Sequence, residues 1–286
     1  MQEPQAVEDE TDVSSLSGTS VHSDTDSLRS SIRDYRRENG RTYHSLTWDG
    51  KLCMCPKKDG ANRVLDIGTG TGIWAMDYGE PHRPGCEAWH GNFADIEQPT
   101  TTPKQWFEID DVEKEWTWQE PFDFVFARHM NACFASWEKF LKQAYDNLEP
   151  GGYIELQDNA FPILSGDGTL KEDDPMARWS TLMMEGTELI GRPITVPGIF
   201  RQLLQEAGFE DVVEHKRVWP TSPWPKNEAL RELGFWTQAC SLDGVEPGAL
   251  ALFTRVLGWT REEVLVFIAS VRKDFKNRDI HAYWNV

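Results

Sequence analysis

The sequence predicts an α/β fold, in which a doubly wound, mostly parallel sheet carries a helical C-terminal cap. A β-rich run at residues 63–67 leads into a glycine-rich turn and then into the helical spacing of residues 73–78. Short apolar runs continue to alternate with helical patterns up to residue 218, and this alternation is typical of parallel sheets. After residue 225 the patterns are helical only. Together these three observations indicate a Rossmann-like sheet followed by a cap of helices.

Each further element is predicted from a local pattern. After the strand at 63–67, strands are predicted at residues 88–93, 106–109, 122–127, 153–157 and 211–218. Helices are predicted at residues 73–78, 137–147, 175–186, 199–207, 227–240, 247–257 and 260–275. Gly151, Gly152 and Gly208 lie where helices are expected to stop. Thr260 and Glu263 fit a capping box, which predicts the start of the last helix.

The 286-residue chain is expected to consist of a tail and one domain. Residues 1–28 contain seven acidic residues, six serines and no Lys or Arg. This composition cannot bury enough apolar surface to offset the entropy of ordering, so residues 1–34 are predicted to be a disordered acidic tail. Residues 35–286 then form the domain. Its core is expected at about 62–218, and its helical cap at about 160–200 and 220–280.

Composition excludes several classes of partner. The chain has 29 Lys and Arg against 47 Asp and Glu, which gives a net charge of −18. A surface this acidic repels a phosphate backbone, so nucleic-acid binding is not expected. The longest apolar run, residues 264–271, is far shorter than the roughly 18 residues that a membrane-spanning helix needs. No secretory signal begins the chain, and we expect a cytoplasmic protein, with the nucleus as the alternative.

The five cysteines do not suggest a disulfide framework or a metal centre. They are an odd and scattered set, whereas disulfide-rich domains carry an even number at regular spacings. Cys53 and Cys55 form a Cys-x-Cys pair, but no second ligand pair follows at zinc spacing. We therefore expect no metal.

The glycine-rich turn indicates the ligand. Gly68, Gly70 and Gly72 alternate with threonines, so the backbone can pass close to a bound molecule. The third glycine of a dinucleotide fingerprint would fall at Ile73, and no phosphate-binding lysine follows. Asp66 would repel a pyrophosphate, but it suits a ligand that carries an ammonium or a sulfonium. A nicotinamide-dependent dehydrogenase is therefore disfavoured.

Four runs of residues resemble, in order and spacing, the motifs of class I S-adenosylmethionine-dependent methyltransferases, and especially the fungal LaeA-like group. These runs are residues 64–74, 107–113, 122–129 and 148–155. Residues 222–225, 249–259 and 271–274 also look like that group. The resemblance covers about residues 35–284. It implies that residues 35–286 are a class I methyltransferase domain with S-adenosylmethionine as the cofactor.

The resemblance also implies where the cofactor binds. Asp66 would meet the ammonium of its methionine part, and the three glycines would admit its methionyl and ribose parts. Asp111 matches the family acid that accepts from the adenine amino group, with Asp110 as a neighbouring candidate. Asn92 stands where the family usually has an acid that bridges the ribose hydroxyls, and the lost charge weakens such a contact by about 1 kcal/mol. Arg128 lies at the carboxyl edge of the sheet, beside this site.

His129 is the first candidate for a catalytic base. A hydroxyl or amine acceptor needs a base within hydrogen-bond reach, and imidazole is the side chain whose charge changes nearest to neutral pH. A structural histidine at the sheet edge is the alternative interpretation. Glu155 and Asp158, at the end of the following strand, are weaker candidates.

Two further departures from the family pattern bear on activity. Relatives usually carry an acidic, helix-forming stretch between the segments like 43–46 and 50–52, and its absence here removes part of a cofactor lid. Relatives also continue beyond the segment like 281–286 into a final strand. Without that strand, we expect an unpaired position in the interior of the sheet.

The expected function is methyl transfer to a small molecule, in fungal secondary metabolism. The chain has thirteen tryptophans, and an aromatic acceptor pocket is expected from those of the cap region. These are Trp179, Trp219, Trp224 and Trp236. The alternative is a LaeA-type regulator of secondary-metabolite gene expression that acts through protein partners, or a methyltransferase fold that has lost catalysis.

Overall fold

A computed structural model describes residues 37–38, 41–42, 52–59, 61–70, 72–78, 87–91, 105–108 and 111–286. The expected disordered tail at 1–34 lies outside the described residues. So do Asn92, Asp110 and the region of the missing lid stretch. Two short strands, β1 (Arg37–Glu38) and β2 (Arg41–Thr42), form an antiparallel pair before the main body.

Five parallel strands form the main sheet, in the order β5-β4-β3-β6-β7. Their bounds are β3 Arg63–Ile67, β4 Glu87–Gly91, β5 Gln105–Glu108, β6 Phe122–Arg128 and β7 Leu148–Gln157. The chain runs outward from β3 to β5 on one side and then returns to place β6 and β7 on the other. The predicted doubly wound, parallel sheet is confirmed. Its switch point, between β3 and β6, is where such sheets bind ligands.

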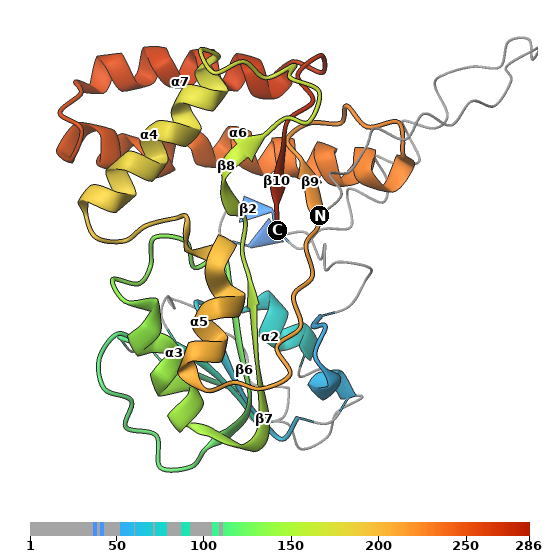
Figure 1. Cartoon of the computed structure of the whole chain (residues 1–286), viewed down its shortest axis with the longest axis vertical. Helices are drawn as coiled ribbons and strands as arrows, with labels where there is room; N and C mark the ends of the chain where they lie inside the picture. The colour runs from blue at the N-terminus through green and yellow to red at the C-terminus, as the bar shows by residue number, and fades with distance from the viewer. Residues whose placement is uncertain are drawn as a thin grey trace, which may run out of the picture.

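Helices cover both faces of this sheet. On one face, α2 (Ile73–Tyr78) stacks Trp74 on Phe126 of β6, with ring centroids 3.9 Å apart. On the other face, α3 (Trp137–Asp146) and α5 (Phe200–Ala207) lie together against β6 and β7 (Figure 1). Gly208 ends α5 in the left-handed conformation, with a φ of 103°, as predicted.

The cap is a second layer with its own core (Figure 1). Its helices are α4 (Pro175–Leu189), α6 (Glu228–Arg255) and α7 (Arg261–Lys276). They pack on an antiparallel sheet that was not predicted, with the strand order β8-β10-β9. Its strands are β8 (Ala160–Leu164), β9 (Val218–Pro220) and β10 (Tyr283–Asn285). Two 3-10 turns, η2 (Pro56–Asp59) and η3 (Val196–Ile199), complete the described elements. No helix of the described residues combines the length and apolarity that crossing a membrane requires.

Three predicted elements of the C-terminal half differ from the structure. The expected helices at 227–240 and 247–257 are one helix, α6, that continues through Pro247. Val245 and Ala249, on either side of this exposed proline, are both buried in the cap core, and their packing offsets the lost hydrogen bond. The expected strand at 211–218 forms only from Val218 onward. Residues 212–217 have no regular structure, and Asp211 has a φ of 52°.

The outer edge of β7 is open. The main sheet ends at β7, so no described strand pairs with that edge. Residues 208–217 line the same cleft as β7 without joining the sheet. At one end of this cleft, Arg217 and Val286 exchange two backbone hydrogen bonds of 2.8 Å. The expectation of an unpaired position in the interior of the sheet is wrong for the described residues, because β7 is the last strand of the main sheet and its free edge is an outer edge.

Candidate functional site

The glycine turn follows β3 at the carboxyl edge of the main sheet. Asp66, near the end of β3, is only 3% exposed, and its Oδ2 accepts a 2.6 Å hydrogen bond from the Thr69 hydroxyl. Gly68, Gly70 and Gly72 have φ values of 69°, 58° and 76°. All three lie in the left-handed region, which side chains other than glycine disfavour. The alternating glycines are therefore required by the backbone of the turn.

Gly68 and Gly70 differ in their surroundings. A Cβ atom on Gly70 would meet nothing within 4 Å, whereas a Cβ on Gly68 would lie 2.3 Å from the sulfur of Met130. Gly68 thus keeps the turn packed against the chain after β6. Gly70 leaves its outer face clear for a ligand that approaches the backbone. The turn and the Asp66 carboxylate beside it fit the cofactor that the sequence predicts.

Arg128 ends β6 close to this carboxylate. Burial lowers the pKa of the Arg128 guanidinium, and the charge of Asp66 acts in the opposite direction. Its guanidinium carbon lies 5.8 Å from the centroid of the Phe126 ring. The expected contact of Arg128 with the cofactor remains a prediction.

Asp111 lies beyond the end of β5, in a turn with Lys114. The Asp111 carboxylate is half exposed and lies 3.5 Å from the Lys114 ammonium. It also accepts a hydrogen bond of 3.2 Å from the backbone amide of Glu113. The structure therefore places Asp111 at the carboxyl edge of the sheet, in an acidic turn. Its expected contact with adenine remains a prediction.

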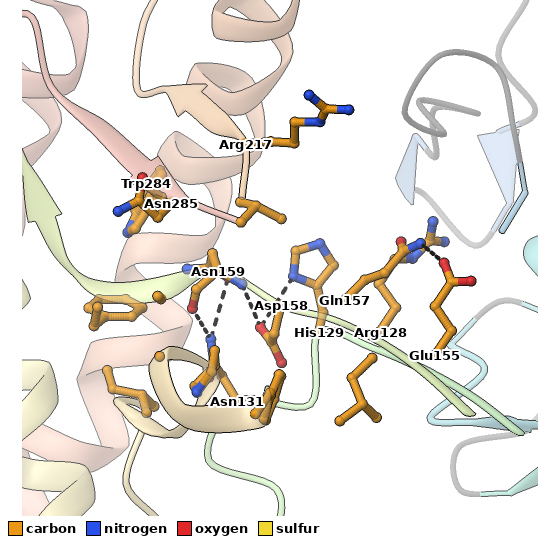
Figure 2. A pocket seen from close by; sticks show the side chains of 18 of the residues that line it. Arg128, His129, Asn131, Glu155, Gln157, Asp158, Asn159, Arg217, Trp284 and Asn285 are labelled. Carbon is orange, nitrogen blue, oxygen red and sulfur yellow. Dashed lines mark hydrogen bonds and ion pairs between the residues drawn. The ribbon is translucent and has the colours of Figure 1, made fainter. Parts of the chain in front are cut away.

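His129 and Asp158 meet where β6 and β7 end. His129 has a φ of 56° and a side chain that is 53% exposed, and its Nδ1 lies 3.9 Å from Oδ1 of Asp158. Burial raises the pKa of Asp158 to about 7, although this carboxylate accepts backbone hydrogen bonds from Asn159, Met130 and Asn131. Figure 2 shows the imidazole turned toward Asp158. A histidine and a carboxyl of raised pKa are thus paired at the sheet edge.

Aromatic side chains line the cleft that extends from this pair into the cap. The cleft has a volume of about 2660 Å³, and Trp179, Trp219 and Trp236 line it as predicted. Trp219 lies 6.1 Å from His129 between ring centroids. Trp224 is outside the cleft, and its prediction as a lining residue is wrong. Its ring stacks on His281 and its N–H donates to the Ala282 carbonyl, so it has a structural role.

Three buried indole N–H groups around the cleft have no hydrogen-bond partner among the described residues. They belong to Trp179, Trp219 and Trp284. An unsatisfied buried donor costs about 1–3 kcal/mol. A ligand with oxygen acceptors would recover part of this cost if the cleft adjusts to it.

Glu155 is not positioned to act as a catalytic base. Its carboxylate accepts hydrogen bonds from the backbone amides of Met54 and Cys55 and from the side-chain amide of Gln157, over 2.6–3.0 Å. Figure 2 shows Arg128, Glu155 and Gln157 directed away from Asp158 and Asn131. The thiols of Cys53 and Cys55 lie close to this carboxylate. Sequence reasoning missed this cluster, because its only local signal was the Cys-x-Cys pair.

Comparisons with known proteins agree with the geometry. Residues 35–215 match the profile of a methyltransferase domain. The chain is 34% identical to the methyltransferase pytC of Aspergillus terreus, over 99% of this chain and 94% of that protein. It is 31% identical to the secondary metabolism regulator LAE1 of Cochliobolus heterostrophus, over 78% of this chain and 74% of that protein. A solved phosphoethanolamine N-methyltransferase 2 of Haemonchus contortus is similar with a TM-score of 0.44 and 16% identity, covering 83% and 51% of the two chains.

Proposed function

The chain belongs to the methyltransferase domain family, and from this premise we propose that it transfers a methyl group from S-adenosylmethionine to a small, partly apolar acceptor of fungal secondary metabolism. The observation that carries the proposal is the position of the His129–Asp158 pair. It lies at the same sheet edge as Asp66 and the glycine turn, and it opens into an aromatic cleft.

Asp66 and the glycine turn would hold the cofactor. When bound, the cofactor supplies a methyl group attached to a sulfonium sulfur. After the transfer, the rest of the cofactor is a neutral thioether. The Asp66 carboxylate, fixed by Thr69, would accept from the ammonium of the methionine part. Gly70 would let the backbone approach, and Asp111 would accept from the adenine amino group at the end of β5. These groups bind and orient, which is most of what an in-line transfer requires.

His129 would remove the proton of the acceptor. As the new bond forms between the acceptor oxygen or nitrogen and the methyl carbon, the acceptor proton moves to the imidazole. Asp158, whose carboxylate is held by three backbone amides, lies 3.9 Å from the ring nitrogen. In its ionised form it would stabilise the resulting imidazolium.

The cleft supports a small acceptor of mixed polarity. Trp179, Trp219 and Trp236 offer apolar ring faces. The unpartnered indole N–H groups favour an acceptor that carries oxygen atoms. The net charge of −18 argues against a nucleic acid as the methylated substrate.

Calorimetric titration with S-adenosylmethionine tests the cofactor site. We expect binding by the wild-type chain and a loss of about 10- to 100-fold in the Asp66→Asn variant, since a charge-assisted hydrogen bond contributes about 1.5–3 kcal/mol. The His129→Ala variant should bind the cofactor normally and lose methyl transfer. Equal binding by wild type and Asp66→Asn, in folded protein, would contradict the assignment of Asp66.

Feeding labelled S-adenosylmethionine to cell extracts with the enzyme tests the acceptor class. We expect the label in the small-molecule fraction. Label found only in protein or nucleic acid would overturn the proposal.

A regulatory function is the second candidate, because the chain is 31% identical to the regulator LAE1. Deletion of the gene separates the two. Loss of one methyl group from one compound, with the tagged chain in the cytoplasm, supports the enzyme. Loss of gene expression across several secondary-metabolite pathways, with the tagged chain in the nucleus, supports a regulator that acts through protein partners.

A further inference from the structure

Three side chains of types that bind metals converge beside β7, and none of them has a role in the proposed methyl transfer. Cys53 and Cys55 precede β3, and Glu155 lies on β7, about 100 residues later in the chain. The two sulfur atoms and a carboxylate oxygen all lie within 4.8 Å of one another. Cys53 is buried, whereas Cys55 and Glu155 are half-buried. Of the described residues, these three form the one such group that could hold a metal ion.

Backbone contacts hold the cluster in place. The amides of Met54 and Cys55 donate to the Glu155 carboxylate at 2.8–3.0 Å, which fixes the loop against β7. Upstream, the Leu52 carbonyl accepts a 2.6 Å hydrogen bond from the indole of Trp74. Downstream, the Lys57 carbonyl accepts a 2.6 Å bond from the Tyr78 hydroxyl. Helix α2 and strand β7 thus position the Cys-x-Cys segment from two sides.

The ligand set and its dimensions suit a zinc ion. In a tetrahedral site, Zn–S bonds of about 2.3 Å place two thiolate sulfurs about 3.8 Å apart, with a carboxylate oxygen somewhat closer to each. The three ligand atoms already lie within 4.8 Å of one another. Side-chain rotations that move them by about an ångström or less would therefore produce this arrangement. Two thiolates select Zn²⁺ over Mg²⁺ or Ca²⁺, which prefer oxygen ligands.

We propose that Cys53, Cys55 and Glu155 bind one Zn²⁺ ion, with water in the fourth position, and that the ion ties the loop at residues 52–59 to β7. Binding releases the two thiol protons, and the divalent charge offsets two of the three negative charges of the ligands. The site links a segment before β3 to the last strand of the main sheet, and it does not depend on the identity of the methyl acceptor.

Cobalt substitution of the reduced, full-length chain tests the site. Co²⁺ bound to thiolates gives a charge-transfer absorption in the near ultraviolet, and competition by Zn²⁺ then reports the zinc affinity. We expect one ion per chain. Cys55→Ser and Glu155→Gln should each weaken binding by at least about 10- to 100-fold, the usual cost of losing even an outer-shell partner. Cys133→Ser and Cys240→Ser, which alter exposed thiols elsewhere, are the matched controls and should bind as wild type does.

Alkylation of the unmodified chain provides a test that needs no variant. Zn²⁺ should protect Cys53 and Cys55 from iodoacetamide, as mapped by mass spectrometry, and leave Cys133 and Cys240 reactive. The melting temperature should rise with Zn²⁺ concentration, because the ion binds the folded state. The proposal is overturned if no thiolate–cobalt absorption develops, if a control variant abolishes it, or if Zn²⁺ protects Cys53, Cys55, Cys133 and Cys240 equally.

Discussion

Gly68 and Gly70 stand two residues apart in one turn, yet the structure gives them different roles. Both have left-handed backbone conformations, so an alanine at either position costs about 1 kcal/mol in strain. A Cβ on Gly68 would also collide with Met130, whereas a Cβ on Gly70 would enter open space. Fold stability and cofactor access are therefore separable at neighbouring glycines.

Paired alanine substitutions test this separation. We expect Gly68→Ala to lower the free energy of unfolding by roughly 2–4 kcal/mol, as strain and overpacking combine. Gly70→Ala should cost only about 1 kcal/mol, but it should weaken S-adenosylmethionine binding more strongly, because its methyl group occupies the cofactor's path. Urea denaturation and calorimetric titration measure the two effects. Identical stability losses in both variants would contradict the packing role of Gly68.

The free energy of unfolding should depend on pH through the protonation of Asp158. Burial raises its pKa from 3.8 to about 7 in the folded chain. Between about pH 4 and pH 7 the folded state therefore holds a proton that the unfolded state has released. The free energy of unfolding should fall as the pH rises through this window, by up to roughly 4 kcal/mol from this group.

Asp158→Asn should remove that slope, and the exposed Asp279→Asn should leave it unchanged. Urea denaturation at a series of pH values measures it. A slope that persists in Asp158→Asn would assign the effect to another group.

The site was predictable from the sequence only where its residues lie close together in the chain. Asp66 and the glycines form one local motif, and Arg128 and His129 follow a recognisable strand. The pairing of Asp158 with His129 was not predictable, because the depth at which Asp158 is buried depends on how β7 enters the cap. The Cys53–Glu155 cluster joins segments about 100 residues apart, and no local pattern indicates such a pairing.

At the scale of an element, helix α6 packs close to a neighbouring loop because the residue at the contact is a glycine. Gly234 lies against the loop that precedes the helix, and a Cβ there would be 2.2 Å from the Ser222 carbonyl oxygen. Backbone atoms cannot move aside as a flexible side chain can. Gly244 lies on the same helix with open space around it.

Alanine at these two positions should have opposite effects. We expect Gly234→Ala to lower the free energy of unfolding by roughly 1–3 kcal/mol through overpacking. Gly244→Ala should raise it by about 0.5–1 kcal/mol, because alanine favours the helix and meets no obstacle. Thermal and urea denaturation of the two variants provide the comparison. A stable Gly234→Ala variant would show that α6 can shift away from the loop.

The elements themselves were predicted best where the local pattern and the packing agree. The parallel strands, α3 and the capping box of α7 follow their sequence signals. At Pro247 the local signal to stop a helix is overridden by core contacts on both sides. The run at 211–218 has strand-like composition, but only its end makes backbone pairs: Arg217 bonds to Val286, and Val218 pairs with Asn285. A strand forms only where such backbone partners are engaged.

At the scale of the whole molecule, the two layers meet at the candidate acceptor site. Strand β7 of the main sheet ends at Gln157 and β8 of the cap begins at Ala160. Only Asp158 and Asn159 lie between them. Asn131 donates a 2.8 Å hydrogen bond to the Asn159 carbonyl, which ties this junction to the chain after β6. The proposed acceptor pocket is thus built where the layers join, and its lining comes from both.

The open edge of β7 leads to a prediction about hydrogen exchange. One edge of β7 pairs with β6, while the other faces the cleft without a strand partner among the described residues. In a parallel sheet, successive amides of a strand point to alternate edges. We therefore expect the β7 amides to divide into a slowly exchanging set bonded to β6 and a faster set that faces the cleft. Exchange measured by nuclear magnetic resonance on the dilute chain resolves the two sets.

Protein concentration is the control for this prediction. Unpaired strand edges are templates for association, so the faster set should slow if chains pair through β7 at high concentration, while the slower set stays unchanged. Uniform protection of both sets in dilute solution would mean that another segment already covers this edge.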